Sequence, residues 1–250
     1  MEEKEYLYMY EEEERHWWYA GMRSIVLSLM PPASVPARPR VLDAGCGTGY
    51  NIGWLKRHYG AVVTGLDISP HALNFCRSRG QPALVRADAA SLPFHANIYD
   101  LVISFDVLIN LKDEMARASA LREFQRVLNP GGRLLVRVPA YKFLQSAHDD
   151  AVMGYHRYGR RELGRAVSAA GFRPLRLTCA NTLLFPVAFA WRMLKKAGFA
   201  PGGSDVGSRT RGGDSVNRAT TSILNFEAAV LRRMNFKFGL SIFLLAEKPE

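Results

Sequence analysis

A short apolar run that breaks into a glycine-rich turn constrains this chain more than any other segment. Val41 and Leu42 are typical of a buried strand, and Asp43 precedes glycines at 45, 47 and 49. Glycine lacks the β-carbon that would keep a ligand off the backbone, and the helix expected from Tyr50 turns its first amides toward an anionic group. The spacing G-x-G-x-G differs from the dinucleotide pattern G-x-G-x-x-G. The segment therefore predicts a strand–turn–helix unit that binds a carboxylate or phosphate.

Strands alternate with helices along the first 140 residues. Apolar runs at 61–67, 83–88, 99–105 and 133–138 are expected to be strands, and two more strands are expected at 175–179 and 241–246. Alternation of this kind predicts a parallel sheet with right-handed crossovers. Gly45, Asp67, Asp88 and Phe105 all fall at or just after the carboxyl end of a strand. Ligands in such sheets bind at that edge, so these positions predict one site.

Five motifs, in order over residues 39–140, resemble those of the class I S-adenosylmethionine-dependent methyltransferases. They are Asp43–Gly49, Gly65–Ser69, Ala87–Ala89, Phe105–Leu108 and Asn129–Gly132. The resemblance implies an α/β fold, a Rossmann-like three-layer sandwich with a seven-stranded, mostly parallel sheet and an antiparallel last strand. It also implies S-adenosyl-L-methionine as cofactor. The cofactor-binding positions expected are Tyr19, Arg23, Asp43, Gly45, Cys46, Gly47, Gly49, Asp67, Ile68, Asp88, Ala89, Phe105, Asp106 and Val107.

Two acidic residues have roles that the resemblance supplies. Asp67 would accept hydrogen bonds from both ribose hydroxyls, a task that suits a carboxylate because it only accepts. Asp88 would accept a bond from the adenine amino group, and Ile68 would lie against the adenine. The alternative for each acid is a cap on the turn or helix that follows its strand.

An aromatic segment at 16–23 resembles the N-terminal lid helix of small-molecule methyltransferases. By that resemblance Arg23 would hold the carboxylate of the cofactor, and Tyr19 would close over it. Trp17, Trp18 or Tyr19 would stack near the sulfonium, a cation that aromatic faces favour, and Trp17 is also expected to contact the acceptor. The alternative is a core stripe of aromatic side chains.

The segment 148–163 follows the fifth strand and contains Tyr155-His156-Arg157-Tyr158, which resembles a His-x-Arg-Tyr motif in a branch of bacterial methyltransferases. His156 is the candidate general base, because its pKa lies near neutral pH, and Tyr158 is expected to orient the acceptor. Tyr155 and Arg157 are expected to contact the acceptor. The alternative is that His156 and Tyr158 pack the start of a helix and that the arginines are solvated.

The second half of the chain is less regular. Residues 1–38 are expected to form lid helices, and residues 39–250 the methyltransferase domain, with an insert at 181–236 between the last two strands. The apolar stretch 182–200 has basic flanks, so it is consistent with an acceptor pocket that includes Phe185, with a membrane-surface segment, or with a packed helix, which we favour. The glycine-rich loop 202–213 is expected to be mobile.

Charge and composition limit the partners. The formal charge is +10, and seven of the first fourteen residues are glutamates, so the rest of the chain is strongly basic. Such a body suits RNA, a phosphorylated substrate or an acidic membrane surface, or it simply keeps the protein soluble. The run Ser104–Val107 lacks the Asn/Asp-Pro-Pro-Tyr/Phe motif of base-methylating relatives, which argues against DNA. The cysteines show no paired spacing, so no metal is expected and a cytoplasmic location fits.

We therefore interpret the sequence as a methyltransferase that acts on a small, partly hydrophobic acceptor, aromatic or lipid-linked. An RNA methyltransferase is the first alternative, and a non-catalytic cofactor-binding subunit is the second. The starting segment is polar, and no apolar run reaches the length of a membrane span, so contact with a membrane would be peripheral.

Overall fold

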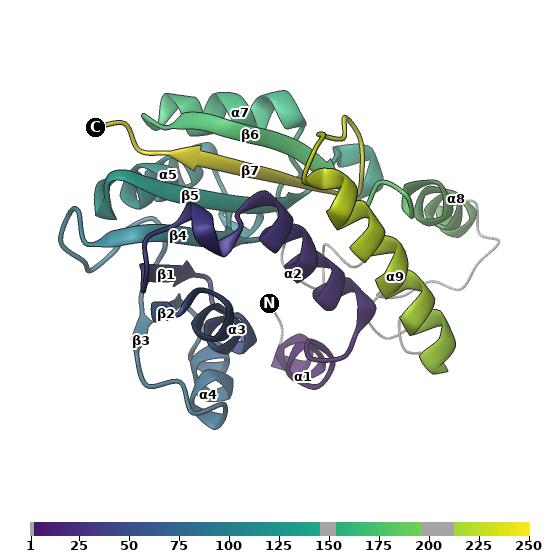
Figure 1. Cartoon of the computed structure of the whole chain (residues 1–250), viewed down its shortest axis with the longest axis horizontal. Coiled ribbons are helices and arrows are strands. Elements are labelled where there is room, and N and C mark those ends of the chain that lie inside the picture. Colours follow the sequence, from purple (N-terminus) through teal and green to yellow (C-terminus); the bar gives the residue numbers. More distant parts are fainter. Residues whose placement is uncertain (1–2, 146–153, 197–212) are drawn as a thin grey trace.

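The structure, a computed structural model, describes residues 3–145, 154–196 and 213–250; these residues form one seven-stranded sheet in the order β3-β2-β1-β4-β5-β7-β6 (Figure 1). The strands are β1 (Arg40–Ala44), β2 (Val62–Asp67), β3 (Leu84–Arg86), β4 (Tyr99–Phe105), β5 (Leu128–Pro139), β6 (Arg173–Ala180) and β7 (Ser241–Glu247). Strand β7 runs antiparallel to both of its neighbours, β5 and β6, and the other strand pairs are parallel. The predicted Rossmann-like fold with an antiparallel last strand is confirmed.

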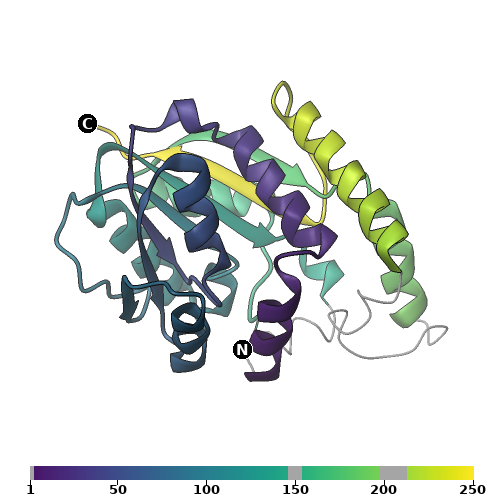
Figure 2. The same cartoon turned by 60° about the horizontal axis from the view of Figure 1, so that its bottom comes forward.

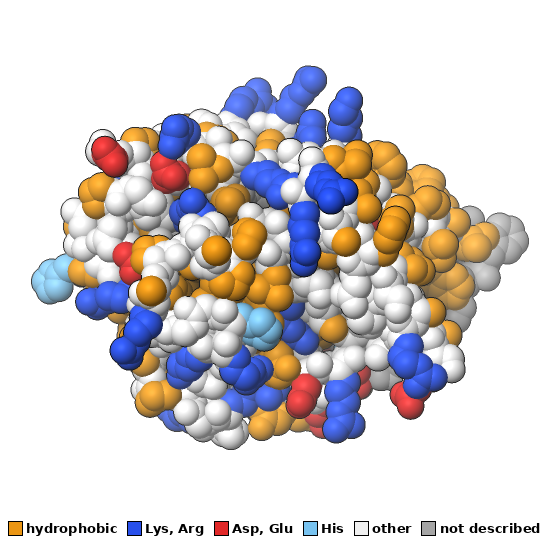
Figure 3. All heavy atoms as spheres, in the orientation of Figure 1, with side chains coloured by type: hydrophobic (Ala, Val, Ile, Leu, Met, Phe, Trp, Pro, Cys, Tyr) orange, Lys and Arg blue, Asp and Glu red, His pale blue; other side chains and the backbone are white. Residues whose placement is uncertain are grey.

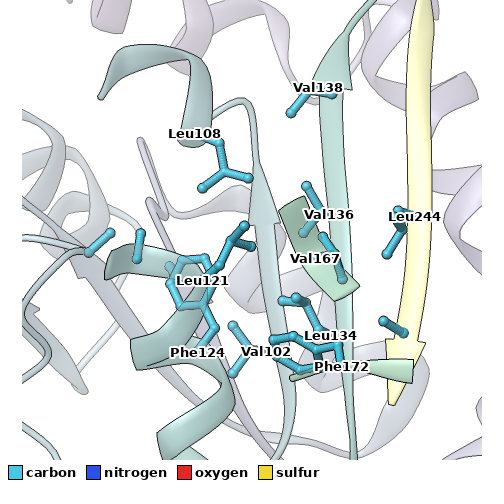
Figure 4. Close-up of a cluster of buried hydrophobic side chains, with 14 of the residues drawn as sticks. Val102, Leu108, Leu121, Phe124, Leu134, Val136, Val138, Val167, Phe172 and Leu244 are labelled. Atoms are coloured by element: carbon cyan, nitrogen blue, oxygen red, sulfur yellow. The ribbon is translucent and has the colours of Figure 1, made fainter. Parts of the chain in front are cut away.

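Helices cover both faces of the sheet and make it the middle of three layers (Figure 2). The helices are α1 (Glu3–Glu12), α2 (Trp17–Leu29), α3 (Tyr50–Tyr59), α4 (Pro70–Ser78), α5 (Glu114–Val127), α7 (Arg160–Ala169), α8 (Phe185–Lys196) and α9 (Gly213–Leu231), with short 3-10 turns η1 (Pro32–Ser34), η2 (Leu108–Asn110) and η3 (Lys142–Leu144). Two clusters of buried side chains hold the layers together. On one face, Phe124 of α5 and Val167 of α7 pack on the strands (Figure 4). On the other, Ile25, Leu55 and Leu224 bring α2, α3 and α9 together.

Local capping explains where two of the crossover helices begin. Ser69 accepts a hydrogen bond from the amide of Ala72 at 3.4 Å, and Pro70 occupies the first turn of α4. Asp113 accepts one from the amide of Ala116 at 2.7 Å at the start of α5. Both side chains satisfy amides that have no partner within the helix.

The N-terminal segment, which was expected to form lid helices, begins with helix α1. Residues 1–14 are rich in glutamate, but two tyrosines of α1 pack against the rest of the protein: Tyr6 is buried, and the Tyr10 ring lies 4.9 Å from that of Phe75. The chain then turns into α2, which lies beside α9 (Figures 1 and 2). Asn217 of α9 accepts a hydrogen bond from the amide of Trp17 at 2.7 Å.

The segment 181–236 supplies α8 and α9 between β6 and β7. Only Gly213 of the expected loop 202–213 is described, as the first residue of α9; residues 148–153 of the segment 148–163 also lie outside the described residues. Within the part of the chain that is described, no helix has both the length and the apolarity to cross a membrane.

Candidate active site

A cavity of about 800 Å³ lies at the carboxyl edge of the parallel strands. Gly45, Asp67, Phe105 and Pro139 line it, and each stands at or directly after the end of β1, β2, β4 or β5. These strands are adjacent in the sheet, so four segments far apart in sequence meet at one edge. This is where a doubly wound sheet binds its ligand.

The glycine turn after β1 is built by its own hydrogen bonds. Gly45 and Gly49 have φ angles of +84° and +83°, which favour glycine, and the amide of Gly45 donates to the carbonyl of Leu66 at 2.7 Å. A β-carbon on Gly45 would lie 2.1 Å from Cγ2 of Val107, and one on Gly49 would lie 2.8 Å from Sγ of Cys76. Glycine is therefore required here by close packing within the protein as well as by the needs of a ligand.

Asp67 both holds this turn and faces the cavity. One carboxylate oxygen accepts a hydrogen bond from the amide of Gly47 at 3.0 Å, and the other accepts one from the amide of Ser69 at 2.9 Å. Burial raises the pKa of Asp67, and these backbone amides counteract the rise. The turn-capping alternative and the ligand-binding prediction are thus compatible, because each carboxylate oxygen has a second lone pair.

Asp88, Ala89 and Ile68 line the cavity beyond Asp67. Asp88 accepts a hydrogen bond from the amide of Ala90 at 2.8 Å, so it also caps its own turn. Ile68 is 62% exposed although it is a large apolar side chain. An exposed isoleucine between two carboxylates is a surface on which a flat aromatic ring can rest.

Asp43 does not line the cavity, although the motif placed it there. It is buried beneath the turn, and its Oδ2 has no hydrogen-bond partner among the described residues. Burial, together with the nearby carboxyl groups of Asp67 and Glu13, raises the pKa of Asp43 to about 8. Gly49 is likewise outside the cavity, at the start of α3, whereas Cys46 and Gly47 line it.

Helix α2 supplies an aromatic part of the cavity wall. Trp17, Trp18, Tyr19 and Arg23 all line the cavity. The Arg23 guanidinium donates to the carbonyl of Glu13 at 2.9 Å, and it lies 4.4 Å from the centre of the Tyr50 ring. Arg23 therefore fixes the turn between α1 and α2 while it faces the cavity.

Glu13 is a cavity residue that the sequence did not reveal. It is 5% exposed, and its carboxylate accepts hydrogen bonds from the hydroxyl of Thr48 in the glycine turn and, at 3.0 Å, from Arg79. Burial raises its pKa to about 7, although both partners lower it. In the sequence Glu13 is one of four consecutive glutamates, and nothing there distinguishes the buried one.

An arginine–aspartate pair lines the cavity. Arg137 of β5 donates to Asp106, which has a φ of +60°, and the guanidinium lies 4.6 Å from the Trp18 ring centre and 5.0 Å from that of Phe105. Sequence analysis expected Asp106 and Val107 here but missed Arg137. The signal was present, because a lone arginine interrupts the otherwise apolar run Leu134–Val138.

A further part of the cavity wall comes from the segment before α7 and from α8. Tyr155 and Arg157, both expected to contact the acceptor, line it together with Trp191 of α8. Tyr155 is half exposed, whereas Arg157 is buried and donates to the carbonyl of Ala140 at 2.9 Å. Phe185 does not line the cavity; its ring packs 5.9 Å from those of Phe189 and Phe238.

The two candidate catalytic residues also lie off the cavity wall. His156 Nε2 lies 2.6 Å from a carboxylate oxygen of Glu162, whose other oxygen accepts from the amide of Gly159. Tyr158 is 2% exposed, with its ring 4.6 Å from that of His156. Both side chains thus pack the start of α7, because Glu162 draws the imidazole toward that helix. This geometry corrects the assignment of His156 as general base and of Tyr158 as acceptor-orienting residue.

Comparisons with known proteins agree with this site. Residues 42–136 match a family described as a methyltransferase domain. The chain is 39% identical over 105 residues to the tRNA (carboxymethyluridine(34)-5-O)-methyltransferase of Arabidopsis thaliana. The matched residues make up 42% of this chain but only 25% of that protein. It is 31% identical over 166 residues to the "Putative methyltransferase ECU09_1500" of Encephalitozoon cuniculi, covering 59% of this chain and 76% of that protein.

A solved structure shares the fold. Phosphoethanolamine N-methyltransferase 2 of Haemonchus contortus, in complex with S-adenosyl-L-methionine, superposes with a TM-score of 0.59 at 19% identity, over 93% of this chain and 53% of that one. The motifs at the strand ends, the cavity that they line and the match across three quarters of the Encephalitozoon protein lead to one conclusion. The chain belongs to the class I S-adenosylmethionine-dependent methyltransferases.

Proposed function

We propose that this protein transfers the methyl group of S-adenosylmethionine to a small, partly hydrophobic acceptor held between α2 and α8. The observation that carries the proposal is the aromatic part of the cavity wall, where Trp17 and Trp18 of α2 and Trp191 of α8 line the cavity. A volume of about 800 Å³ is in the range of small-molecule sites, roughly 300–1,000 Å³. An aromatic, partly enclosed site of this size suits a metabolite.

The residues at the strand ends fit the cofactor. S-adenosylmethionine carries a sulfonium and an ammonium group, and buried carboxyl groups stand beside the turn: Asp43, Asp67 and Glu13 each have a raised pKa. A cationic ligand would lower those pKa values by charge attraction. We assign the ribose hydroxyls to Asp67 and the adenine to the surface formed by Ile68, Asp88 and Ala89.

The sulfonium supplies an electrophilic methyl group, and the protein contributes mainly alignment. Trp18 and Tyr19 offer aromatic faces to a cation. The ion pair between Arg137 and Asp106 holds both side chains on the cavity wall. With His156 paired to Glu162 outside the cavity, the proposal assigns no histidine to proton removal.

Calorimetric titration with S-adenosylhomocysteine tests the cofactor assignment. Asp67→Ala is expected to abolish binding, but it also removes two bonds that hold the turn. Ile68→Asp is therefore the sharper variant, because its exposed position tolerates a polar side chain while a carboxylate would face the adenine. We expect roughly tenfold weaker binding, from the loss of one apolar contact of about 1.5 kcal/mol.

Asp214→Ala, at the exposed start of α9, is the matched control and is expected to bind like the wild type. Equal binding by the wild type and Ile68→Asp would contradict the adenine assignment. Turnover of a panel of hydrophobic metabolites then tests the acceptor class.

RNA is the second candidate acceptor. It is favoured by the net charge of +10 and by the 39% identity to a tRNA methyltransferase over 105 residues. An RNA acceptor would show binding that weakens steeply with salt. Methyl transfer to bulk tRNA, with none to any small acceptor, would replace the small-molecule proposal.

A further inference from the structure

Helix α8 is apolar and largely exposed. Val187 is 70% exposed, Leu194 47% and Trp191 45%, and Leu183 just before the helix is 44% exposed. Sequence analysis favoured a packed helix here, but the structure leaves most of its apolar side chains at the surface. Exposed apolar side chains that gather in this way mark an interaction surface.

The apolar surface continues onto two neighbouring segments. The Phe143 ring after β5 lies 6.2 Å from that of Phe189, and Phe185 lies 5.9 Å from Phe238 ahead of β7. Phe143 and Phe238 are each 52% exposed. We call this surface the α8 patch, and in Figure 3 hydrophobic side chains gather over α8. Its members are Phe143, Leu183, Val187, Phe189, Trp191, Leu194 and Phe238.

The segments that carry the α8 patch are basic and contain no acid. Residues 141–145, 181–196 and 234–240 include five lysines and arginines and no aspartate or glutamate. Lys142 and Lys237 are exposed, and each directly precedes an exposed phenylalanine of the patch. Apolar side chains flanked by basic ones are typical of a helix that lies in the interface of an anionic bilayer.

The helix that carries the patch also closes the cavity. Ala188 and Trp191 line the cavity, whereas Val187 and Leu194 of the same helix are exposed and do not. A ligand that leaves an apolar phase beside α8 would therefore meet the cavity wall without crossing the molecule.

We propose that the α8 patch docks this protein on the surface of an anionic phospholipid membrane. Docking itself does not depend on the proposed function; delivery of the acceptor from the membrane to the cavity rests on it. A second copy fits less well, because a symmetric contact would bring two basic, acid-free surfaces together. RNA would be attracted by the lysines but gains nothing from exposed Val187 and Leu194.

Vesicle co-sedimentation without cofactor or acceptor tests the proposal. The probes are vesicles of phosphatidylcholine alone and of phosphatidylcholine with 30% phosphatidylglycerol, about a third of the lipid as anionic headgroups. We expect the protein to pellet with the anionic vesicles and much less with the neutral ones. The double variant Val187→Glu/Leu194→Glu should bind the anionic vesicles about tenfold less.

The matched control is Val62→Glu/Met115→Glu, which adds the same charge at exposed apolar positions outside the patch and should bind like the wild type. Titration with S-adenosylhomocysteine shows that each variant is folded, and its result is independent of vesicle binding. Equal loss in both double variants, or no binding of the wild type to anionic vesicles, would overturn the proposal. Analytical ultracentrifugation tests for a second copy. A dimer that Val187→Glu/Leu194→Glu abolishes, together with no vesicle binding, would overturn the proposal in favour of a second copy.

Discussion

Glu13 makes the stability of the protein depend on pH in a way that one substitution removes. Its carboxyl is buried between the glycine turn and Arg79, and burial raises its pKa from an ordinary value of 4.5 to about 7. The folded state therefore holds a proton on Glu13 over a pH range in which the unfolded chain has released it. Stability contributed by the protonated form is present below pH 4.5 and is lost as the pH rises toward 7.

The size of the effect follows from the two pKa values. Between pH 5 and pH 8 the linkage amounts to a loss of about 2.5 kcal/mol in the free energy of unfolding. Glu13→Gln is neutral throughout and keeps an amide oxygen that can accept from Thr48, so it avoids this loss. The Asp43 carboxyl acts in the same direction, because burial and the nearby carboxyl groups of Asp67 and Glu13 raise its pKa.

Urea unfolding at pH 5, 6, 7 and 8, followed by circular dichroism, measures the difference between Glu13→Gln and the wild type. The variant is expected to gain about 2.5 kcal/mol on the wild type from pH 5 to pH 8. Glu14→Gln is the matched control, since it changes the same charge at an exposed neighbour and should leave the profile unchanged. A constant difference across the pH range, or one that moves the other way, would refute the reasoning.

Two further substitutions test packing around the site. Tyr158→Phe removes a buried hydroxyl that lacks a partner among the described residues. We expect the free energy of unfolding to stay unchanged or to rise by up to about 1 kcal/mol, and turnover to be kept. A catalytic role of Tyr158 would instead lower kcat at least about a hundredfold. Gly21→Ala places a β-carbon 2.2 Å from Cδ1 of Leu224 in α9. Thermal unfolding should therefore show destabilisation by about 1–3 kcal/mol. Helix propensity alone favours a rise in Tm, and such a rise would show that α2 and α9 separate easily.

The parts of the site that sequence analysis predicted are local to a strand end. Gly45, Asp67 and Phe105 each follow a recognisable apolar strand, and the parallel order of those strands is enough to bring them to one edge. The residues that it missed or misplaced depend on packing. Glu13 is buried because α1 closes on the turn, which no pattern in a glutamate run predicts. His156 lies off the cavity because Glu162, six residues later, pairs with it and fixes the start of α7.

The order of the strands also has a consequence for synthesis of the chain. Strand β7 pairs with both β5 and β6, and among the described strands β6 has no other partner. While the ribosome is still making residues before 241, β6 has no neighbour, and β5 presents an open edge. Such an edge is a template for pairing with other chains. The sheet is therefore completed only after residues 241–247 have been made, and until then the open edge of β5 can pair with another chain.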